Sequence, residues 1–291
     1  MFTLSLPQSA PMTQLSLPPL WFLEKSESAM RDLLSPLAQW FPAPSRFVRN
    51  RSDLPLHPGQ YALLSTLMEA VKKTMTPGHY LGATMEQGRT LLAAEMSGDY
   101  NDIHVNPDRP HPLFGRLIAH GMDAVTQALV VLRDEIADQQ LVLHQASITF
   151  LQPVFLGEDQ LSIHVSKTTP TEWRIDVSAK KNQGSVERIV IKMSVCLKGG
   201  TPFNEEDWFR AHMTLWRISA LIAETWPSAL YAKQELTFHR PMTGSEIGIV
   251  VRGQGENSRG HCEVSTEALP PNRSLWPAIT GKATIVLSKV A

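Results

Sequence analysis

The sequence of 291 residues predicts an α+β fold in which a long antiparallel sheet wraps around a central helix, and it predicts that this unit is duplicated along the chain. Three observations lead to this prediction. They are an apolar helix at 122–136, a run of strand-like segments after it, and a recurrence of the whole pattern at an offset of 88 residues. A helix that is apolar on most sides needs protein around it, and an antiparallel sheet can provide that cover.

The segment from 81 to 136 predicts two helices with a loop between them. A helical pattern over 90–96 ends at the turn-forming run Ser97-Gly98-Asp99-Tyr100-Asn101. His120-Gly121 then opens the second helix. Its apolar residues recur every three or four positions, at Met122, Val125, Leu129, Leu132 and Ile136. Further apolar residues widen this face, so we expect the helix to be enclosed.

Strands dominate the next part of the chain. The strand-like segments are 145–155, 160–167, 172–181 and 186–196. Apolar and polar residues alternate in Ser147-Ile-Thr-Phe150 and in Leu161-Ser-Ile-His-Val165, which is typical of strands with one buried face. A buried helix followed by such strands predicts a sheet that curls around the helix.

The same order of elements recurs near the C-terminus. A helix is predicted over 206–226, and strands over 235–242, 246–251, 261–266 and 282–288. The 88-residue offset aligns Thr149 with Thr237, Phe150 with Phe238, and Pro153 with Pro241. Helix, strand, proline and glycine in the same order indicate a degenerate duplication. We expect Gly253-Gln-Gly255 to form a hairpin turn within this second copy.

These patterns divide the chain into three regions. Residues 1–80 are predicted to form an N-terminal arm and a helical extension, with helical spacing at 21–41 and 60–75 and a basic link at 46–55. Residues 81–200 form the first α+β unit, and residues 201–291 form its repeat.

The composition argues against several classes of function. The 27 basic and 28 acidic side chains give a net charge of −1 without a basic block, so we expect no nucleic-acid partner. The two cysteines, Cys196 and Cys262, form no CxxC pair, which argues against a disulfide framework and a cysteine-based zinc site. The uncharged, proline-containing N-terminus lacks the basic start of a signal peptide. We therefore expect a cytoplasmic protein without a membrane span.

The segment 97–122, SGDYNDIHVNPDRPHPLFGRLIAHGM, contains the candidate catalytic residues. Asp99 and His104 lie on either side of a turn, and reference pKa values of about 3.9 and 6.5 suit proton transfer near neutral pH. Asn101 lies between them, with an amide that can orient a neighbour. Gly121 stands at the start of the apolar helix, where free N–H groups and partial positive charge suit an oxyanion. This combination is suited to enolate chemistry next to a carbonyl.

This segment resembles the signature of the MaoC-like family, the (R)-specific enoyl-CoA hydratases and 3-hydroxyacyl dehydratases. The resemblance rests on Ser97-Gly-Asp-x-Asn-x-Ile-His104, followed by Phe114-Gly and by Ile118-Ala-His-Gly-Met122. It covers roughly residues 85–135 and implies the hotdog fold, here a double hotdog whose second copy lacks the Asp/His motif. Asp102 stands where the family often has proline, and three prolines in the following loop at 106–112 put the usual acyl specificity in doubt.

The resemblance also implies the role of each residue. Asp99 and His104 would catalyse the reversible conversion of a (3R)-3-hydroxyacyl thioester to a trans-2-enoyl thioester and water, and the Gly121 N–H would hold the thioester oxygen. Asn101, Ser97 and His120 would position the substrate. The partner is acyl-CoA or an acyl carrier protein, whose phosphopantetheine belongs to the substrate, and no separate cofactor is expected. A homodimer or an intrachain pseudo-dimer is expected.

Other interpretations remain open at this stage. The chain could be a catalytically idle acyl-thioester binding module of a fatty-acid or polyketide assembly, or a thioesterase on the same fold. The intact pair of Asp99 and His104 argues against an idle module. These two residues could also be grouped with His111 and His120 as metal ligands, but no HExxH or similar spacing supports that grouping, so we expect no metal.

Overall fold

The computed structural model describes residues 51–55, 80–137, 139–181, 186–227, 229–240, 246–256, 260–269 and 277–287. The helices predicted at 21–41 and 60–75 lie outside these residues. Part of the basic link predicted at 46–55 is instead a short edge strand, β1 (Arg51–Pro55), because its backbone pairs with another strand of the sheet.

The two halves of the chain contain the same kinds of element. The first half has α3 (Gln87–Ser97), α4 (Asp102–Val105), α5 (Gly121–Glu135), β2 (Tyr80–Thr84), β3 (Leu141–Phe150), β4 (Asp159–Lys167), β5 (Glu172–Lys181) and β6 (Arg188–Gly199). The second half has α6 (Glu205–Thr225), β7 (Leu230–Phe238), β8 (Glu246–Glu256), β9 (His261–Leu269) and β10 (Ile279–Val286).

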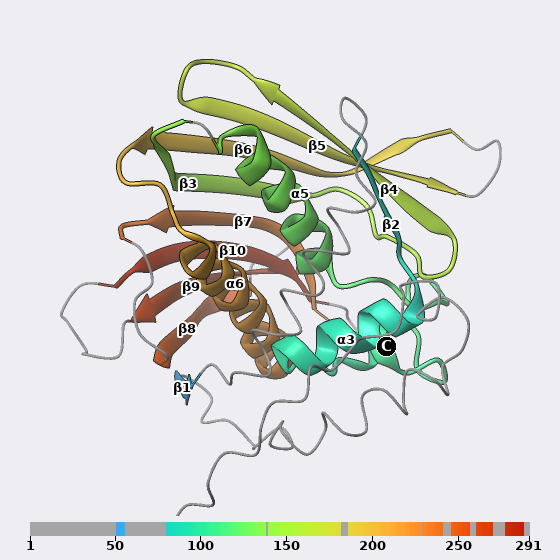
Figure 1. Ribbon diagram of the computed structural model, residues 1–291. Helices are drawn as coiled ribbons and strands as arrows, with labels where there is room; N and C mark the ends of the chain where they lie inside the picture. The colour runs from blue at the N-terminus through green and yellow to red at the C-terminus, as the bar shows by residue number, and fades with distance from the viewer. Residues whose placement is uncertain are drawn as a thin grey trace, which may run out of the picture.

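All ten described strands join in one antiparallel sheet, in the order β1-β8-β9-β10-β7-β3-β6-β5-β4-β2. From the central pair outward, the order β3-β6-β5-β4-β2 matches β7-β10-β9-β8-β1 strand for strand. The sheet curves around α5 and α6, which lie next to each other (Figure 1). This architecture confirms the predicted α+β double hotdog, and it joins the two repeats as a pseudo-dimer within one chain.

Helix α5 forms the centre of the first repeat. Its residues from Met122 to Leu132 are all buried, which confirms the expectation drawn from its apolar spacing. Helix α6 holds it from the side of the second repeat, because the Trp216 indole N–H donates to Thr126 Oγ1 at 2.6 Å and lies 3.2 Å from the Met122 carbonyl oxygen. The indole thus satisfies polar groups in the first turns of α5 and fixes the two helices together.

The hairpin turn predicted at Gly253-Gln-Gly255 is wrong. These residues lie within strand β8, which continues to Glu256 with an irregular register against β9 between Gly253 and Glu256. A Cβ on Gly253 would lie 2.4 Å from the Trp226 indole, so the glycine serves close packing against that ring rather than a change of chain direction.

In the described part of the chain, no helix combines the length and the apolar character needed to cross a bilayer.

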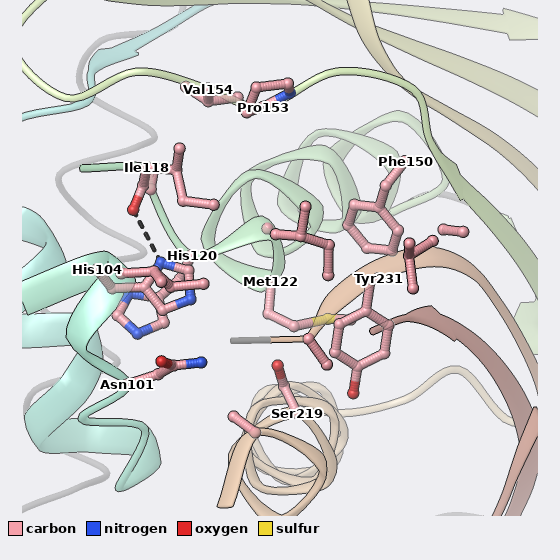
Figure 2. Close-up of a pocket in the computed structure, with 18 of the residues that line it drawn as sticks. Asn101, His104, Ile118, His120, Met122, Phe150, Pro153, Val154, Ser219 and Tyr231 are labelled. Carbon is pink, nitrogen blue, oxygen red and sulfur yellow. Dashed lines mark hydrogen bonds between the residues drawn. The ribbon is translucent and has the colours of Figure 1, made fainter. Parts of the chain in front are cut away.

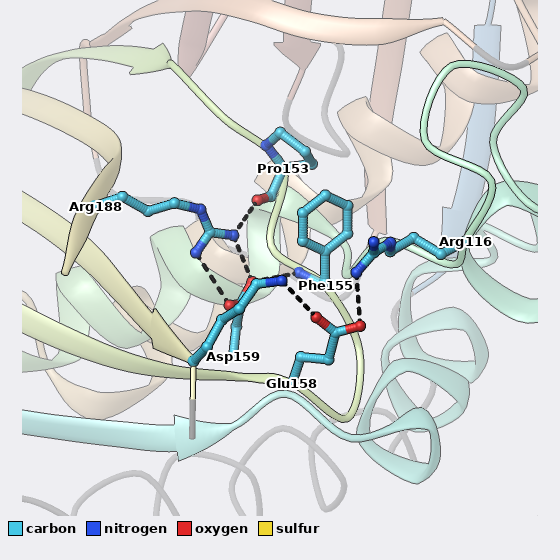
Figure 3. Close-up of polar contacts among 7 residues, drawn as sticks. Arg116, Pro153, Phe155, Glu158, Asp159 and Arg188 are labelled. Atoms are coloured by element: carbon cyan, nitrogen blue, oxygen red, sulfur yellow. Dashed lines mark hydrogen bonds and ion pairs between the residues drawn. The ribbon is translucent and has the colours of Figure 1, made fainter. Parts of the chain in front are cut away.

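An ion-pair network fixes the segment between β3 and β4 (Figure 3). Arg188 donates to both carboxylate oxygens of the fully buried Asp159, at 3.0 and 2.6 Å, and to the Pro153 carbonyl oxygen at 2.9 Å. Asp159 also accepts the Phe155 N–H at 2.7 Å. Arg116 crosses over the Phe155 ring at 4.5 Å and pairs with Glu158. The network therefore connects the β3–β4 turn to the chain just before α5.

We expect Asp159→Asn to lower the free energy of unfolding by about 3 kcal/mol, because it leaves the Arg188 guanidinium without its charged partner. This is the low end of the range for buried pairs, since Arg188 keeps 21% of its side chain exposed. Urea denaturation measures the change. Glu235→Gln in the exposed pair with Lys233 is the control and should cost less than about 1 kcal/mol. Equal losses in the two variants would contradict the assignment.

Candidate active site

A pocket of about 260 Å³ lies where the two repeats meet (Figure 2). The first repeat contributes polar residues on one side and the start of α5. The second repeat contributes α6 and β7. The pocket lining includes the following residues, which are discussed below: Asp99, Asn101, His104, His120, Gly121, Met122, Phe150, Ser219 and Tyr231. The structure therefore brings five of the six predicted site residues, all but Ser97, to one pocket.

The end of α3 positions Asp99. Gly98 has φ +80°, a left-handed conformation that glycine adopts without strain, and its N–H closes the helix on the Ala94 carbonyl. The Ser97 hydroxyl donates to the Ala93 carbonyl at 2.7 Å and accepts the Asp99 N–H at 3.0 Å. Ser97 is not among the residues that line the pocket, and its predicted role in positioning the substrate stays a prediction. Its hydroxyl is used to shape the turn that carries Asp99.

His104 lies in the short helix α4, with its ring held by a backbone contact. Its Nδ1 lies 2.8 Å from the Ile118 carbonyl oxygen. Because a carbonyl can only accept, Nδ1 carries the proton and Nε2 keeps its lone pair. Burial lowers the pKa of His104 well below its usual value, His120 lowers it further, and the bond to Ile118 opposes these effects only in part. The ring is therefore a neutral base at pH 7.

His120 lies against Asp99 and His104. Its Nε2 is 3.0 Å from the Asp99 carbonyl oxygen and 3.8 Å from Asp99 Oδ2, and its ring centroid is 4.0 Å from that of His104. The sequence placed His120 among the substrate-positioning residues, and the fold shows that it also contacts the Asp99 side of the dyad directly.

Burial also sets the acidity of Asp99. It raises the pKa of the Asp99 carboxyl above its usual value, while His120 and the Asn101 N–H, 3.2 Å from Oδ1, act in the opposite direction. A carboxylate with a raised pKa lies beside a histidine with a lowered one. Both shifts disfavour the charged form of each group, which suits the exchange of a proton with a substrate.

Gly121 begins α5 at the pocket wall. Its N–H is in the first turn of the helix, where no carbonyl of the same helix can accept it, and the N-cap residue His120 makes no side-chain cap bond. A Cβ on Gly121 would lie 2.7 Å from the Phe150 ring. Glycine thus lets the helix start approach Phe150 and the pocket closely.

Asp99, His104 and His120 also meet the simplest geometric requirement of a metal site. One ligand atom of each lies within 4.8 Å of the others. Two imidazoles and a carboxylate form a common ligand set for zinc and related ions. Backbone carbonyls occupy His104 Nδ1 and His120 Nε2, so His104 Nε2 and His120 Nδ1 are the nitrogens that could bind a metal. His111, which the sequence grouped with them, instead accepts the Leu113 N–H in its own loop. The expectation of no metal stays a prediction.

Two further pocket residues, Ser219 and Tyr231, were not predicted from the sequence. Both belong to the repeat without the motif, Ser219 on α6 and Tyr231 on β7. No spacing signal connects them to Asp99, since the pairing of β7 with β3 and the packing of α6 against α5 bring them to the site.

No family model and no curated protein matches the chain. Among solved structures, the chain is similar to a tesB protein of Mycobacterium avium subsp. paratuberculosis, with 10% identity over 75% of this chain and 98% of that one and a TM-score of 0.48. A MaoC-like dehydratase gives 8% identity over 74% and 99% of the two chains and a TM-score of 0.47. At such values the similarity concerns the fold alone and carries no argument about chemistry.

We expect Gly121→Ala to lower the free energy of unfolding by about 1–3 kcal/mol, because the new methyl group presses on the Phe150 ring. Phe150→Leu should relieve part of that cost, which a double-mutant cycle in urea denaturation measures. Gly199→Ala is the control, since a Cβ there meets no atom within 4 Å. Strictly additive effects of the two substitutions would contradict the proposed contact.

Proposed function

We propose that the protein catalyses reversible hydration and dehydration of acyl thioesters, between (3R)-3-hydroxyacyl and trans-2-enoyl forms. One observation carries the proposal. A neutral histidine with a free Nε2, a buried carboxylate and the N-terminus of a buried helix line one pocket. The match of Asp99, His104 and Gly121 to the MaoC-like signature supports this assignment.

In hydration, water binds between the Asp99 carboxylate and His104 Nε2. The pair takes one proton as the water oxygen forms its bond to C3, and the C2–C3 double bond becomes the enolate of the thioester. The pair then returns one proton to C2. The dyad is unchanged after the cycle, and one water has been added. In dehydration the same steps run in reverse: the pair removes the C2 proton and protonates the leaving 3-hydroxyl.

The enolate intermediate needs a donor at the thioester oxygen. The Gly121 N–H and the partial positive charge of the α5 N-terminus meet this need, because a preorganised amide in a buried site stabilises developing negative charge more strongly than water does. Asn101 lines the same pocket and is the N-cap residue of α4, so its amide is well placed to orient the reacting oxygen.

The pocket lining supports an acyl group as the substrate. Most of it is apolar, including Ile103, Met122, Phe150 and Ile222, and no lysine or arginine is among the described lining residues. The thiol carrier, CoA or the phosphopantetheine of a carrier protein, then lies outward from the reacting carbons. No separate cofactor is part of this proposal.

Asp99→Asn and His104→Ala should each reduce kcat/KM for hydration of crotonyl-CoA by about 10²–10⁴-fold, because each removes a proton-transferring group. Loss of the conjugated enoyl-thioester absorbance measures the rate, and chiral analysis should give the (R)-3-hydroxy product. Longer enoyl-CoAs and enoyl carrier-protein substrates are tested in the same way.

A chelator should leave the wild-type rate unchanged, and loss of the rate with recovery on adding zinc would assign the cluster to a metal.

The same assay separates the rival functions. Release of free thiol at the rate of substrate loss would identify a thioesterase, in which the dyad directs water to C1 instead of C3. Tight binding of enoyl thioesters without turnover on any carrier would identify an idle binding module. Wild-type turnover that survives both substitutions would contradict the role of the dyad.

The acidic limb of the pH profile tests the contact between His120 and Asp99. The reaction needs Asp99 as a carboxylate, so activity falls as the pH drops through its raised pKa. His120 lowers that pKa, and His120→Gln should therefore move the acidic limb of kcat/KM to higher pH. The exposed His164 provides a control, and His164→Gln should leave the limb in place. An acidic limb that stays fixed or moves to lower pH in His120→Gln would contradict this account.

A further inference from the structure

Tyr231 brings a polar group from the second repeat into the pocket. It lies on β7, its ring centroid is 5.7 Å from that of Phe150, and it lies across the pocket from His104 and His120 with Met122 between them (Figure 2). Its hydroxyl oxygen is buried and has no well-placed hydrogen-bond partner in the described part of the chain, where the Ser219 hydroxyl offers only a weak contact.

The surroundings keep this hydroxyl neutral. Burial raises the pKa of Tyr231 far above its usual value, the nearby Ser219 hydroxyl opposes that change in part, and the negative charge of Asp99 adds to it. Tyr231 can therefore donate and accept a hydrogen bond, and it cannot act as an anion near pH 7. Ser219 lies beside it, so two hydroxyl groups from the second repeat meet on this wall.

Burying a hydroxyl against an apolar acyl chain costs free energy, because the hydroxyl loses its hydrogen bonds to water. Such groups in native proteins call for an explanation. The reacting part of the substrate does not explain the buried hydroxyl. In the proposed mechanism, Asp99 and His104 already contact the 3-hydroxyl, and the Gly121 N–H already binds the thioester oxygen. The carrier arm does not explain the hydroxyl either, because it leads to solvent while the Tyr231 oxygen has almost no exposed surface.

We propose that Tyr231, with Ser219, forms a subsite for a neutral oxygen substituent, a hydroxyl or a carbonyl, on the acyl chain beyond C3. A carboxylate is disfavoured because no lysine or arginine is among the described lining residues and Asp99 already places a negative charge there. The volume of about 260 Å³ fits a short acyl chain. This inference rests on the proposed function, and it adds the class of substrate.

Binding of unreactive saturated thioesters tests the subsite without requiring turnover. The probes are pentanoyl-CoA and its 4-hydroxy, 5-hydroxy and 4-oxo derivatives, measured by calorimetry. Wild-type protein should bind one of the oxygenated probes about 10-fold or more tightly than pentanoyl-CoA, because only that probe satisfies the buried hydroxyl.

Tyr231→Phe should abolish this preference and bind pentanoyl-CoA at least as tightly as the wild type does. Ser219→Ala should reduce the preference in part. The control is Tyr100→Phe, which removes the hydroxyl of a tyrosine that does not line the pocket and should leave the preference unchanged.

The outcomes separate the subsite from the proposed function. Wild-type affinities that are equal for all probes, or the absence of binding by every probe, would overturn the subsite even if crotonyl-CoA is hydrated. A preference that survives Tyr231→Phe would also overturn it. A preference that disappears in Tyr231→Phe, in a protein that hydrates no enoyl thioester, would support the subsite and reject the hydration chemistry.

Discussion

The backbone of Ile118 is the contact on which the geometry of the site depends. Its N–H donates to the Ile103 carbonyl at 3.1 Å, and its own carbonyl accepts from His104 Nδ1. The next N–H, of Ala119, donates to the Val154 carbonyl at 2.8 Å. Two residues later α5 begins at Gly121. One short stretch therefore fixes the tautomer of His104, the position of the Gly121 N–H and the approach of the β3–β4 turn.

The wrapped sheet makes this arrangement rigid. A helix that is buried on nearly every side cannot shift without losing contacts with β4 and β5 of its own repeat and with α6 of the other, since interiors are close-packed. The ion pair of Asp159 with Arg188 holds the turn on which Ala119 rests, and Trp216 holds the first turns of α5 from the other repeat. Contacts outside the pocket thus help to place the groups that line it.

The sequence predicted the elements whose pattern is local and missed the contacts that only the fold creates. The spacing of α5 and the alternation in β3 and β4 reflect burial, so periodicity could identify them. The hairpin turn predicted at Gly253 was wrong because glycine is common in turns, whereas here it makes room for the Trp226 ring. The motif located Asp99 and His104, but the contact of His120 with Asp99 joins residues 21 apart, and no local pattern encodes it.

The second repeat has a structural role that does not depend on a catalytic motif. It supplies half of the sheet and the helix that holds α5, so it cannot be lost even though it carries no Asp/His motif. Its pocket residues are under weaker constraint. His104 is fixed by a backbone bond that any change would break, whereas the hydroxyl of Tyr231 is bound to no backbone group in the described residues. Under the proposed function, substitutions at Tyr231 or Ser219 would change which acyl group fits while Asp99 and His104 stay in place.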